Sequence, residues 1–368
     1  MKSYHQNVKD VAQDVHHFFY RTYKNIHING PAIDPAHLKD AGLMITCTHR
    51  SMADYYLLGM FLHEIGIGNL RFAAGDNLTK LPLIGPKFRA FGAFTVERNG
   101  AFKRSYIRRL CDQVVSMIED NDSIIVFPEG GRSYHGEMLD MKGGVLSAAI
   151  VAQARNPQKK IFILPIAFSY ERLYELPFFK LLEKGKNLRK RTNPFFKQWL
   201  GAVFYFGADI LAVIKLYCNY KLGRKQGDIF IDYAAPILIG DLVDIAANYS
   251  AQSKDEFFAH KNSIQLLGET VREKLMELYR LLPLHLVSYA AKQHPSLMLG
   301  ELQKSLRETL DRLNKQKRNT SLLDPLSDEQ ILSAGIEQLS VFHAVTVSDD
   351  HLKIMKPSII DYFAAAVC

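Results

Sequence analysis

The chain has 368 residues, of which 48% are hydrophobic and 23% are charged, a balance typical of globular proteins that excludes a disordered chain. The formal net charge of +8 favours an anionic partner, such as nucleic acid, an anionic lipid surface or a phosphorylated substrate. The four cysteines are far apart, without a CxxC pair or metal-ligand spacing, so we expect reduced thiols in a cytosolic compartment and no metal site.

Strand and helix signals alternate along the first two thirds of the chain. Residues 1–24 carry charges throughout and lack the apolar core of a signal peptide, so we expect a leading amphipathic helix and no signal peptide. Short apolar or β-branched runs predict strands at 25–34, 42–48, 71–75, 90–96, 123–127, 161–168 and 228–237. Helical periodicity begins near Asp54 and recurs at 103–119 and 143–154. Strands separated by helices predict an α/β sheet whose functional loops lie at strand ends.

The stretch CTHRSMADYYLLG contains His49 and Asp54 at the expected strand-to-helix junction. The two side chains can meet only if His49 precedes the helix and Asp54 lies in its first turn, because five positions of an ideal helix turn through about 500°. A histidine held by a carboxylate suits a general base that takes a proton from a hydroxyl. The alternative is structural: Ser51 and Asp54 fit a capping box in which Ser51 is the N-cap and the carboxylate satisfies a backbone N–H.

FPEGGRS follows the strand expected at 123–127. Its glycines allow close approach of a ligand to the backbone, and Arg132 can bind phosphate or carboxylate in bidentate fashion. A plain turn would also explain Pro-Glu-Gly-Gly, although not the Arg-Ser behind it. Arg98, after the strand expected at 90–96, and Lys142 in DMKGG are further candidate anion contacts, with solvated loop residues as the alternative.

Residues 199–214 form an apolar segment that contains Asp209. At about 16 residues it is shorter than the roughly 20 needed to cross a bilayer, so we expect a buried or an interfacial helix. The basic run of residues 184–199 precedes it and ends in aromatic residues. It is either a solvated loop beside a core helix or an interfacial anchor on anionic headgroups.

The pattern changes after about residue 240. Residues 255–280 and 301–317 show helical spacing, and no strong strand signal returns until the VFHAVTV region. We therefore expect three parts: an N-terminal helix over 1–24, a catalytic domain over 25–245 and a mainly helical domain over 246–368.

Four blocks occur in order: THRSMADY, GAFTVER, VFPEGGRS and ILPIAFSYER. Together they resemble the glycerolipid acyltransferase superfamily, and most closely the glycerol-3-phosphate acyltransferases of the bacterial inner-membrane and mitochondrial type. HRS-x-x-DYYLL, EGGRS and the Tyr-Glu after the fourth block favour this branch over the lysophosphatidate acyltransferases. The C-terminal HLKIMKPSIIDYFAAAV resembles the tail of the larger enzymes, so the likeness runs from about residue 25 to the end.

This resemblance implies a mixed β-sheet flanked by helices with a mainly helical C-terminal domain. It implies that His49 and Asp54 are catalytic and that Pro165 lies on the acyl-donor side. The resemblance assigns substrate binding to Arg98, Glu129, Gly130, Gly131, Arg132 and Ser133. We add Lys142 to this set as an anion contact. Where the family usually has two arginines in the second block, this chain has Glu97-Arg98.

The implied reaction moves a fatty acyl group from acyl-CoA or acyl-carrier protein to the sn-1 hydroxyl of glycerol-3-phosphate and gives lysophosphatidate. These thioesters are co-substrates, and we expect no cofactor. No GxSxG serine is present, so we expect direct attack by the hydroxyl without a covalent enzyme intermediate. Because Glu97 removes a positive charge, another acceptor stays open (lysophosphatidate, dihydroxyacetone phosphate or another lysophospholipid), as does an inactive lipid-binding relative.

We expect an anionic membrane surface as a partner, on the cytoplasmic face of a membrane such as the bacterial inner membrane. Nucleic acid is not expected, because the basic residues are dispersed and no RNA- or DNA-binding motif occurs. HExxH, P-loop and GxGxxG patterns are also missing from the sequence.

Overall fold

A computed structural model describes residues 16–75, 92–96, 104–189, 193–246, 259–294 and 296–368. Within them, an eight-stranded sheet has the order β1-β7-β6-β2-β5-β3-β4, with β8 beside β6. The strands are β1 (Ile26–Asn29), β2 (Gly42–Cys47), β3 (Leu70–Gly75), β4 (Ala93–Val96), β5 (Ser123–Val126), β6 (Ile161–Tyr170), β7 (Ile229–Tyr233) and β8 (Ile237–Leu238). β6 pairs antiparallel with β7 and β8, and the other pairs are parallel, so the expected mixed sheet is confirmed.

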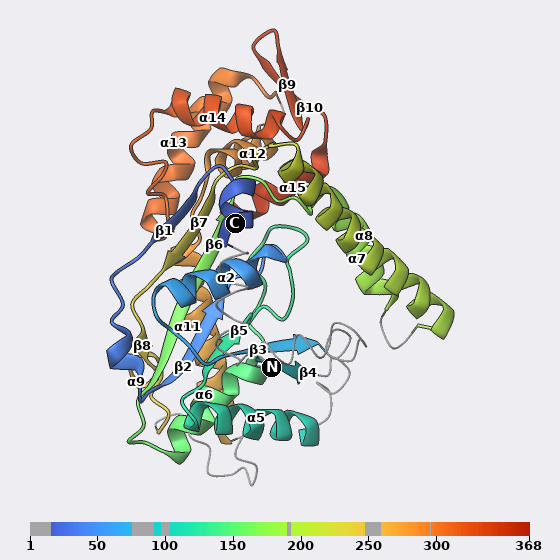
Figure 1. Ribbon diagram of the computed structural model, residues 1–368. Helices are drawn as coiled ribbons and strands as arrows, with labels where there is room; N and C mark the ends of the chain where they lie inside the picture. Colours follow the sequence, from blue (N-terminus) through green and yellow to red (C-terminus); the bar gives the residue numbers. More distant parts are fainter. Residues whose placement is uncertain (1–15, 76–91, 97–103, 190–192, 247–258, 295) are drawn as a thin grey trace.

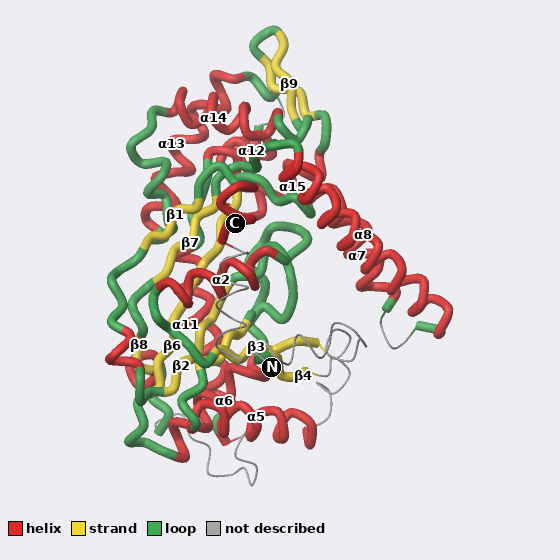
Figure 2. The backbone as a smooth tube through the Cα atoms, viewed as in Figure 1, coloured by secondary structure: helices red, strands yellow, loops and turns green. Residues whose placement is uncertain are grey.

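Helices cover both faces of this sheet (Figures 1 and 2). The helices that accompany it are α2 (Ala53–Glu64), α5 (Arg104–Glu119), α6 (Gly143–Arg155) and α11 (Lys261–Leu278). Successive side chains of β2 point to opposite faces of the sheet, so they contribute to two separate hydrophobic cores. Leu43, Ile45 and Cys47 share a core with α2, whereas Met44 packs with α5, α6 and α11. β2 is buried along its whole length, as expected for a central strand covered on both sides.

The C-terminal third is mainly helical, as expected. It contains α12 (Pro283–Gln293), α13 (Leu299–Lys315), α14 (Asp328–Ser340) and α15 (Pro357–Ala364), with the antiparallel hairpin of β9 (Val345–Ser348) and β10 (His351–Ile354). Buried residues of these helices and residues of the sheet belong to one continuous core. The boundary near residue 245 stays a prediction. Residues 16–22 are helical, and the rest of the expected leading helix lies outside the described residues.

Two helices form a hairpin that projects from the body, at the right of Figure 1. They are α7 (Phe179–Leu188) and α8 (Phe195–Lys221), joined through residues 189–194. The expected length of this element was wrong, because α8 has 27 residues and not about 16. Polar and aromatic residues at both ends continue the helix beyond its apolar stretch. The buried alternative was also wrong, since only 22% of the most apolar 18-residue stretch is buried.

Candidate active site

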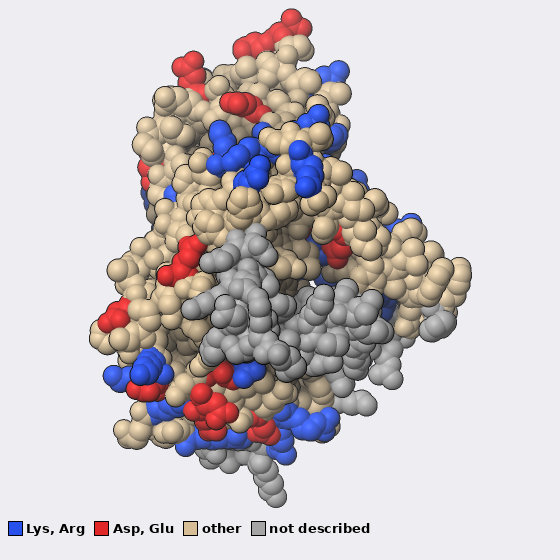
Figure 3. Space-filling view, in the orientation of Figure 1, with Lys and Arg blue, Asp and Glu red and all other residues tan. Residues whose placement is uncertain are grey.

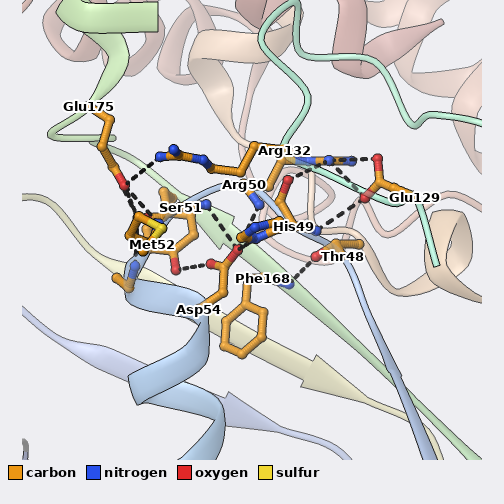
Figure 4. A network of polar contacts seen from close by, with 12 residues as sticks. Thr48, His49, Arg50, Ser51, Met52, Asp54, Glu129, Arg132, Phe168 and Glu175 are labelled. Carbon is orange, nitrogen blue, oxygen red and sulfur yellow. Dashed lines mark hydrogen bonds and ion pairs between the residues drawn. The ribbon is translucent and has the colours of Figure 1, made fainter. Parts of the chain in front are cut away.

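The candidate site lies where β2, β5 and β6 end. β2 leads into His49, β5 leads into the loop that carries Glu129 and Arg132, and β6 leads into Tyr170 and Glu175. These three strands run parallel to one another, so their carboxyl ends meet at one edge of the sheet, the usual place for ligands in open α/β sheets. Figure 4 shows the side chains converging from these separate segments.

His49 and Asp54 meet, as the sequence predicts. His49 Nδ1 lies 2.9 Å from Asp54 Oδ2, and both side chains are buried. A carboxylate only accepts hydrogen bonds, so Nδ1 carries the proton and Nε2 holds the lone pair that a general base needs. The imidazole ring also packs against Phe127, with 4.5 Å between ring centroids, and edge-on against Tyr55. Ring packing and the hydrogen bond together hold the base in one orientation.

The carboxylate of Asp54 also shapes the chain before α2. Its Oδ2 accepts from the backbone N–H groups of Arg50 at 2.7 Å and Ser51 at 2.9 Å, and Oδ1 accepts from the hydroxyl of Tyr170. The carboxylate thus satisfies backbone N–H groups, as the structural alternative expects, while it also holds the ring of His49. The N-cap itself was wrongly placed, because α2 begins at Ala53 with Met52 as its cap. Ser51 instead donates its hydroxyl to Glu175 and accepts from the N–H of Ala53.

Burial lowers the pKa of His49 below its ordinary value, although the hydrogen bond and the charge of Asp54 act in the opposite direction. Removal from water disfavours the charged imidazolium, and the nearby Arg132 adds to that effect. The ring is therefore neutral at pH 7. A neutral imidazole can accept a proton, which is the form that base catalysis requires.

Glu129 is fully engaged by its own protein. Its carboxylate accepts from the backbone N–H groups of His49 at 3.1 Å and Leu139 at 3.0 Å, and both of its oxygens pair with Arg50 Nη1, at 2.9 and 3.0 Å. Arg50 is 1% exposed and also lies over the ring of Tyr279 in the C-terminal third. Glu129 and Arg50 thus hold the backbone of His49 in place through buried hydrogen bonds.

The rest of the EGGRS loop is shaped by close approach. Gly130 has a φ of +73°, and a Cβ there would lie 3.0 Å from the Lys142 side chain. The N–H of Ser133 donates to the carbonyl of His49 at 3.4 Å, and its hydroxyl accepts from the N–H of Gly136. A Cβ on Gly131 would lie 3.8 Å from Lys186 Nζ on α7. The loop therefore sits between the histidine and the projecting hairpin.

Arg132 points into an acidic and aromatic environment and is 3% exposed. Its Nη2 donates to Asp209 Oδ1 at 2.9 Å and to the Tyr205 hydroxyl at 3.2 Å, both on α8. Its Nη1 lies 3.7 Å from Glu175 Oε1 and makes no hydrogen bond within the described residues. Burial raises the pKa of Glu175 to about 7, although Arg132 and donors from Met52 and Ser51 oppose the shift.

Three of the predicted site residues are not part of this cluster or lie outside the described residues. Lys142 is exposed at the start of α6, where its N–H donates to the carbonyl of Pro128. Pro165 is buried within β6, opposite Thr46 of β2. Arg98 and the neighbouring Glu97 lie outside the described residues. The sequence interpretation assigned no site role to Arg50, Tyr170, Glu175, Tyr205 or Asp209. Arg50 stands in the HRS-x-x-DYYLL motif, Asp209 interrupts the apolar segment of residues 199–214, and a Tyr-Glu follows the fourth block, but none of these signals pointed to a site role.

The described part of the chain contains no group of three or more His, Cys, Asp or Glu side chains arranged to hold a metal ion.

Comparison of the sequence with known proteins gives similarity to acyltransferases. Residues 26–169 match the acyltransferase family model. The chain is 26% identical to a glycerol-3-phosphate acyltransferase of Xylella fastidiosa strain M23 over 340 residues, which are 89% of this chain and 37% of the relative. It is 38% identical to that of Xanthomonas campestris pathovar campestris over 197 residues, 53% of this chain and 20% of the relative. The chain thus spans about a third of the length of the first of these relatives.

Proposed function

We propose that this chain, whose residues 26–169 match the acyltransferase family model, transfers a fatty acyl group from acyl-CoA or acyl-carrier protein to the sn-1 hydroxyl of glycerol-3-phosphate. The observation that carries the proposal is the buried bond of 2.9 Å between His49 and Asp54 at the carboxyl edge of the sheet. It supplies an oriented neutral base, and the sequence carries no GxSxG serine that would serve as a nucleophile.

The proposed reaction is a direct displacement. His49 Nε2 takes the proton from the acceptor hydroxyl while the hydroxyl oxygen attacks the thioester carbonyl carbon. The tetrahedral intermediate then collapses, the C–S bond breaks, and the departing thiolate takes the proton from the imidazolium. Proton transfer to His49 is worth on the order of 10²–10⁴ in rate, and Asp54 keeps the ring oriented and stabilises the transient charge. Alignment of both substrates supplies much of the remaining acceleration.

Cationic side chains at this edge would bind the acceptor phosphate. We assign Arg98 and Arg132 to it, with Lys142 at the outer side of the EGGRS loop. The hydrogen-bonding capacity left on Arg132 Nη1 supports this assignment, since a guanidinium favours phosphate oxygens. Gly130, Gly131 and Ser133 would shape the backbone around the phosphate, and Glu129 would hold His49 in place. Pro165 is assigned to the acyl-donor side.

Asp209 and Glu175 already offset part of the charge of Arg132. The identity of the acceptor therefore needs a direct test. The purified protein would receive labelled acyl-CoA, or acyl-carrier protein, with glycerol-3-phosphate, lysophosphatidate, dihydroxyacetone phosphate and another lysophospholipid in parallel. We expect the highest kcat/KM with glycerol-3-phosphate. A preference for another acceptor would move the function to that substrate, and no transfer with either donor would favour an inactive lipid-binding relative.

The proposed product is a lipid, so we place the protein on the cytoplasmic face of a membrane, the inner membrane of a bacterium. The similarity to bacterial enzymes supports the choice of a bacterium, and the long apolar helix α8 supports contact with a membrane.

A further inference from the structure

One face of α8 exposes large apolar side chains along its whole length. Phe196, Trp199, Val203, Ile210, Ile214 and Tyr217 are between 48% and 68% exposed. They are spaced by three, four or seven positions, so they form a single stripe. The stripe extends for about 32 Å at 1.5 Å per residue. The opposite face is the one that packs, with Gly201, Ala208, Ala212 and Leu216 buried.

A stripe of this kind marks an interaction surface, because scattered exposed apolar residues are normal but a contiguous row is not. The projecting hairpin is mostly tan in Figure 3, which means that few charged side chains cover the side turned to the reader. The apolar character therefore needs a partner that is apolar over a similar length.

Cations from both helices of the hairpin lie beside aromatic rings of α8. Lys184 lies 4.7 Å from the ring of Phe204, Arg189 5.2 Å from that of Phe206, and Lys221 5.4 Å from that of Tyr217. The exposed lysines Lys186 and Lys215 lie on the same hairpin. Apolar and aromatic residues flanked by lysine and arginine match the acyl boundary and the headgroups of an anionic bilayer. This charge pattern favours a lipid surface over a second protein.

The midpoint of α8 is held to the site. Asp209 pairs with Arg132 at 2.9 Å, and Tyr205 one turn earlier bonds to the same guanidinium. By length and apolar composition α8 could cross a membrane. A crossing helix would place Asp209 near the bilayer centre and would separate it from Arg132, at a cost of several kcal/mol for the uncompensated charges. The ion pair is kept only if the helix lies along the surface.

We propose that the α7–α8 hairpin docks this protein onto anionic membranes, with α8 lying flat in the headgroup region and its exposed stripe facing the acyl chains. The proposal rests on the membrane location given under the proposed function and names the element that makes the contact, and its binding tests do not require transfer activity. It also explains why Asp209 faces the EGGRS loop: the tether brings the carboxyl edge of the sheet beside the lipid surface, where a lipid product would leave.

Trp199 makes the docking directly measurable, because it is the single tryptophan of the chain and is 57% exposed within the stripe. The full-length protein would be mixed with vesicles of phosphatidylcholine alone or with phosphatidylglycerol. We expect a blue shift of the tryptophan emission and binding that strengthens with the anionic lipid and weakens with salt. No blue shift with any vesicle, or equal affinity for neutral and anionic vesicles, would overturn the proposal.

The depth of a tryptophan side chain in the bilayer distinguishes a helix that lies flat from one that crosses. Ile210→Trp in a Trp199→Phe background moves the probe to the middle of α8. With lipids brominated at shallow or deep chain positions, a flat helix gives shallow quenching of both probes. A crossing helix gives deep quenching of the probe at 210 alone, and that result would contradict the proposal.

Matched substitutions test the face. Ile210→Glu with Ile214→Glu should weaken vesicle binding by about tenfold or more, since it puts charge where apolar area is buried. Val347→Glu with Met355→Glu is the control, because these residues are 46% and 50% exposed on and beside the β9–β10 hairpin. Equal losses in both variants would overturn the assignment to α8. Unchanged vesicle binding in the α8 variant would also overturn it. If light scattering then showed that the α8 variant had lost a dimer formed by the wild type, the stripe would be an interface between two copies of the chain.

Discussion

Asp54 connects local structure to chemistry at the scale of a single residue. The same carboxylate bonds to His49 Nδ1, to two backbone N–H groups ahead of α2 and to the hydroxyl of Tyr170. These contacts order the turn after β2, and the ordered turn is what aims the imidazole. The turn and the base are therefore one structural unit, and a change at Asp54 affects both.

The pH dependence of the rate should report the lowered pKa of His49. The base must be neutral, so kcat/KM should fall as the pH drops through that pKa, with a midpoint below the ordinary 6.5. Asp54→Asn removes the carboxylate, whose hydrogen bond and charge raise this pKa most, so the acidic limb should move to still lower pH. The rate at pH 8 should fall on the order of 10²–10⁴.

Glu175, whose pKa burial raises to about 7, is a second buried titratable group beside Ser51 and provides the control. Glu175→Gln removes its ionisation and should leave the acidic limb of the profile in place. A limb that disappears in Glu175→Gln and persists unchanged in Asp54→Asn would assign the titration to Glu175 and contradict the role of His49.

Glu175 should also make stability depend on pH. Burial raises its pKa in the folded state from 4.5 to about 7, so the folded protein binds more protons than the unfolded chain between these values. The free energy of unfolding therefore falls as pH rises through this interval, by up to about 3 kcal/mol from this group. Urea denaturation at pH 5 and pH 8 should show Glu175→Gln gaining on the wild type at the higher pH. A constant difference would contradict this assignment.

At the scale of elements, glycines let α7 and α8 pack with their backbones in contact. A Cβ on Gly201 would lie 2.8 Å from the carbonyl oxygen of Gly185 and 2.7 Å from Leu188 Cβ. On the same helix, a Cβ on Gly207 would meet no other atom of the described residues within 4 Å. The hairpin is therefore held by a close crossing at one point, and this crossing sets where Asp209 meets Arg132.

These two glycines make a matched pair of substitutions. Gly207→Ala should stabilise the protein by about 0.5–1 kcal/mol, because alanine is the better helix former. Gly201→Ala should destabilise it by about 1–3 kcal/mol through overpacking. Chemical denaturation measures both. Equal stabilisation by the two changes would show that the helices do not cross closely.

The same elements show what the sequence can reveal. Strands such as β2 and β5 are predictable because their apolar runs end at clear breaks, and His49 and Asp54 are predictable because their spacing is local. The length of α8 was not predictable, because the helix continues past the apolar run of residues 199–214 and includes Phe196 and Tyr217. Asp209 looked like a charge out of place in an apolar segment, and its partner Arg132 lies 77 positions away. Sequence spacing carries no information about such long-range pairs.

At the scale of the whole molecule, the sheet and the C-terminal helices share one core. Leu57 of α2, Phe168 of β6, Leu286 of α12 and Phe363 of α15 belong to the same buried cluster. Arg50, the residue after His49, lies over Tyr279, which leads into α12. The C-terminal third thus supports the site from behind, and composition alone gave no sign of this support.

A fragment of residues 1–245 should therefore fail to fold on its own, although the change in sequence character suggests a domain boundary there. It would lose α11 and α12 and expose the core that they cover. Circular dichroism during heating should show one cooperative transition for the whole chain and none for the fragment. A cooperative transition in the fragment would establish two independent domains.

The central claim is that His49 is the base of an acyl transfer, and one comparison tests it most directly. Transfer of labelled acyl groups from acyl-CoA to glycerol-3-phosphate would be measured for the wild type, His49→Ala and the exposed control His37→Ala, with folding checked by circular dichroism. The account predicts wild-type activity in His37→Ala and a loss on the order of 10²–10⁴ in His49→Ala. A folded His49→Ala protein that keeps more than about a tenth of the wild-type rate would contradict it, because the base term alone exceeds that factor.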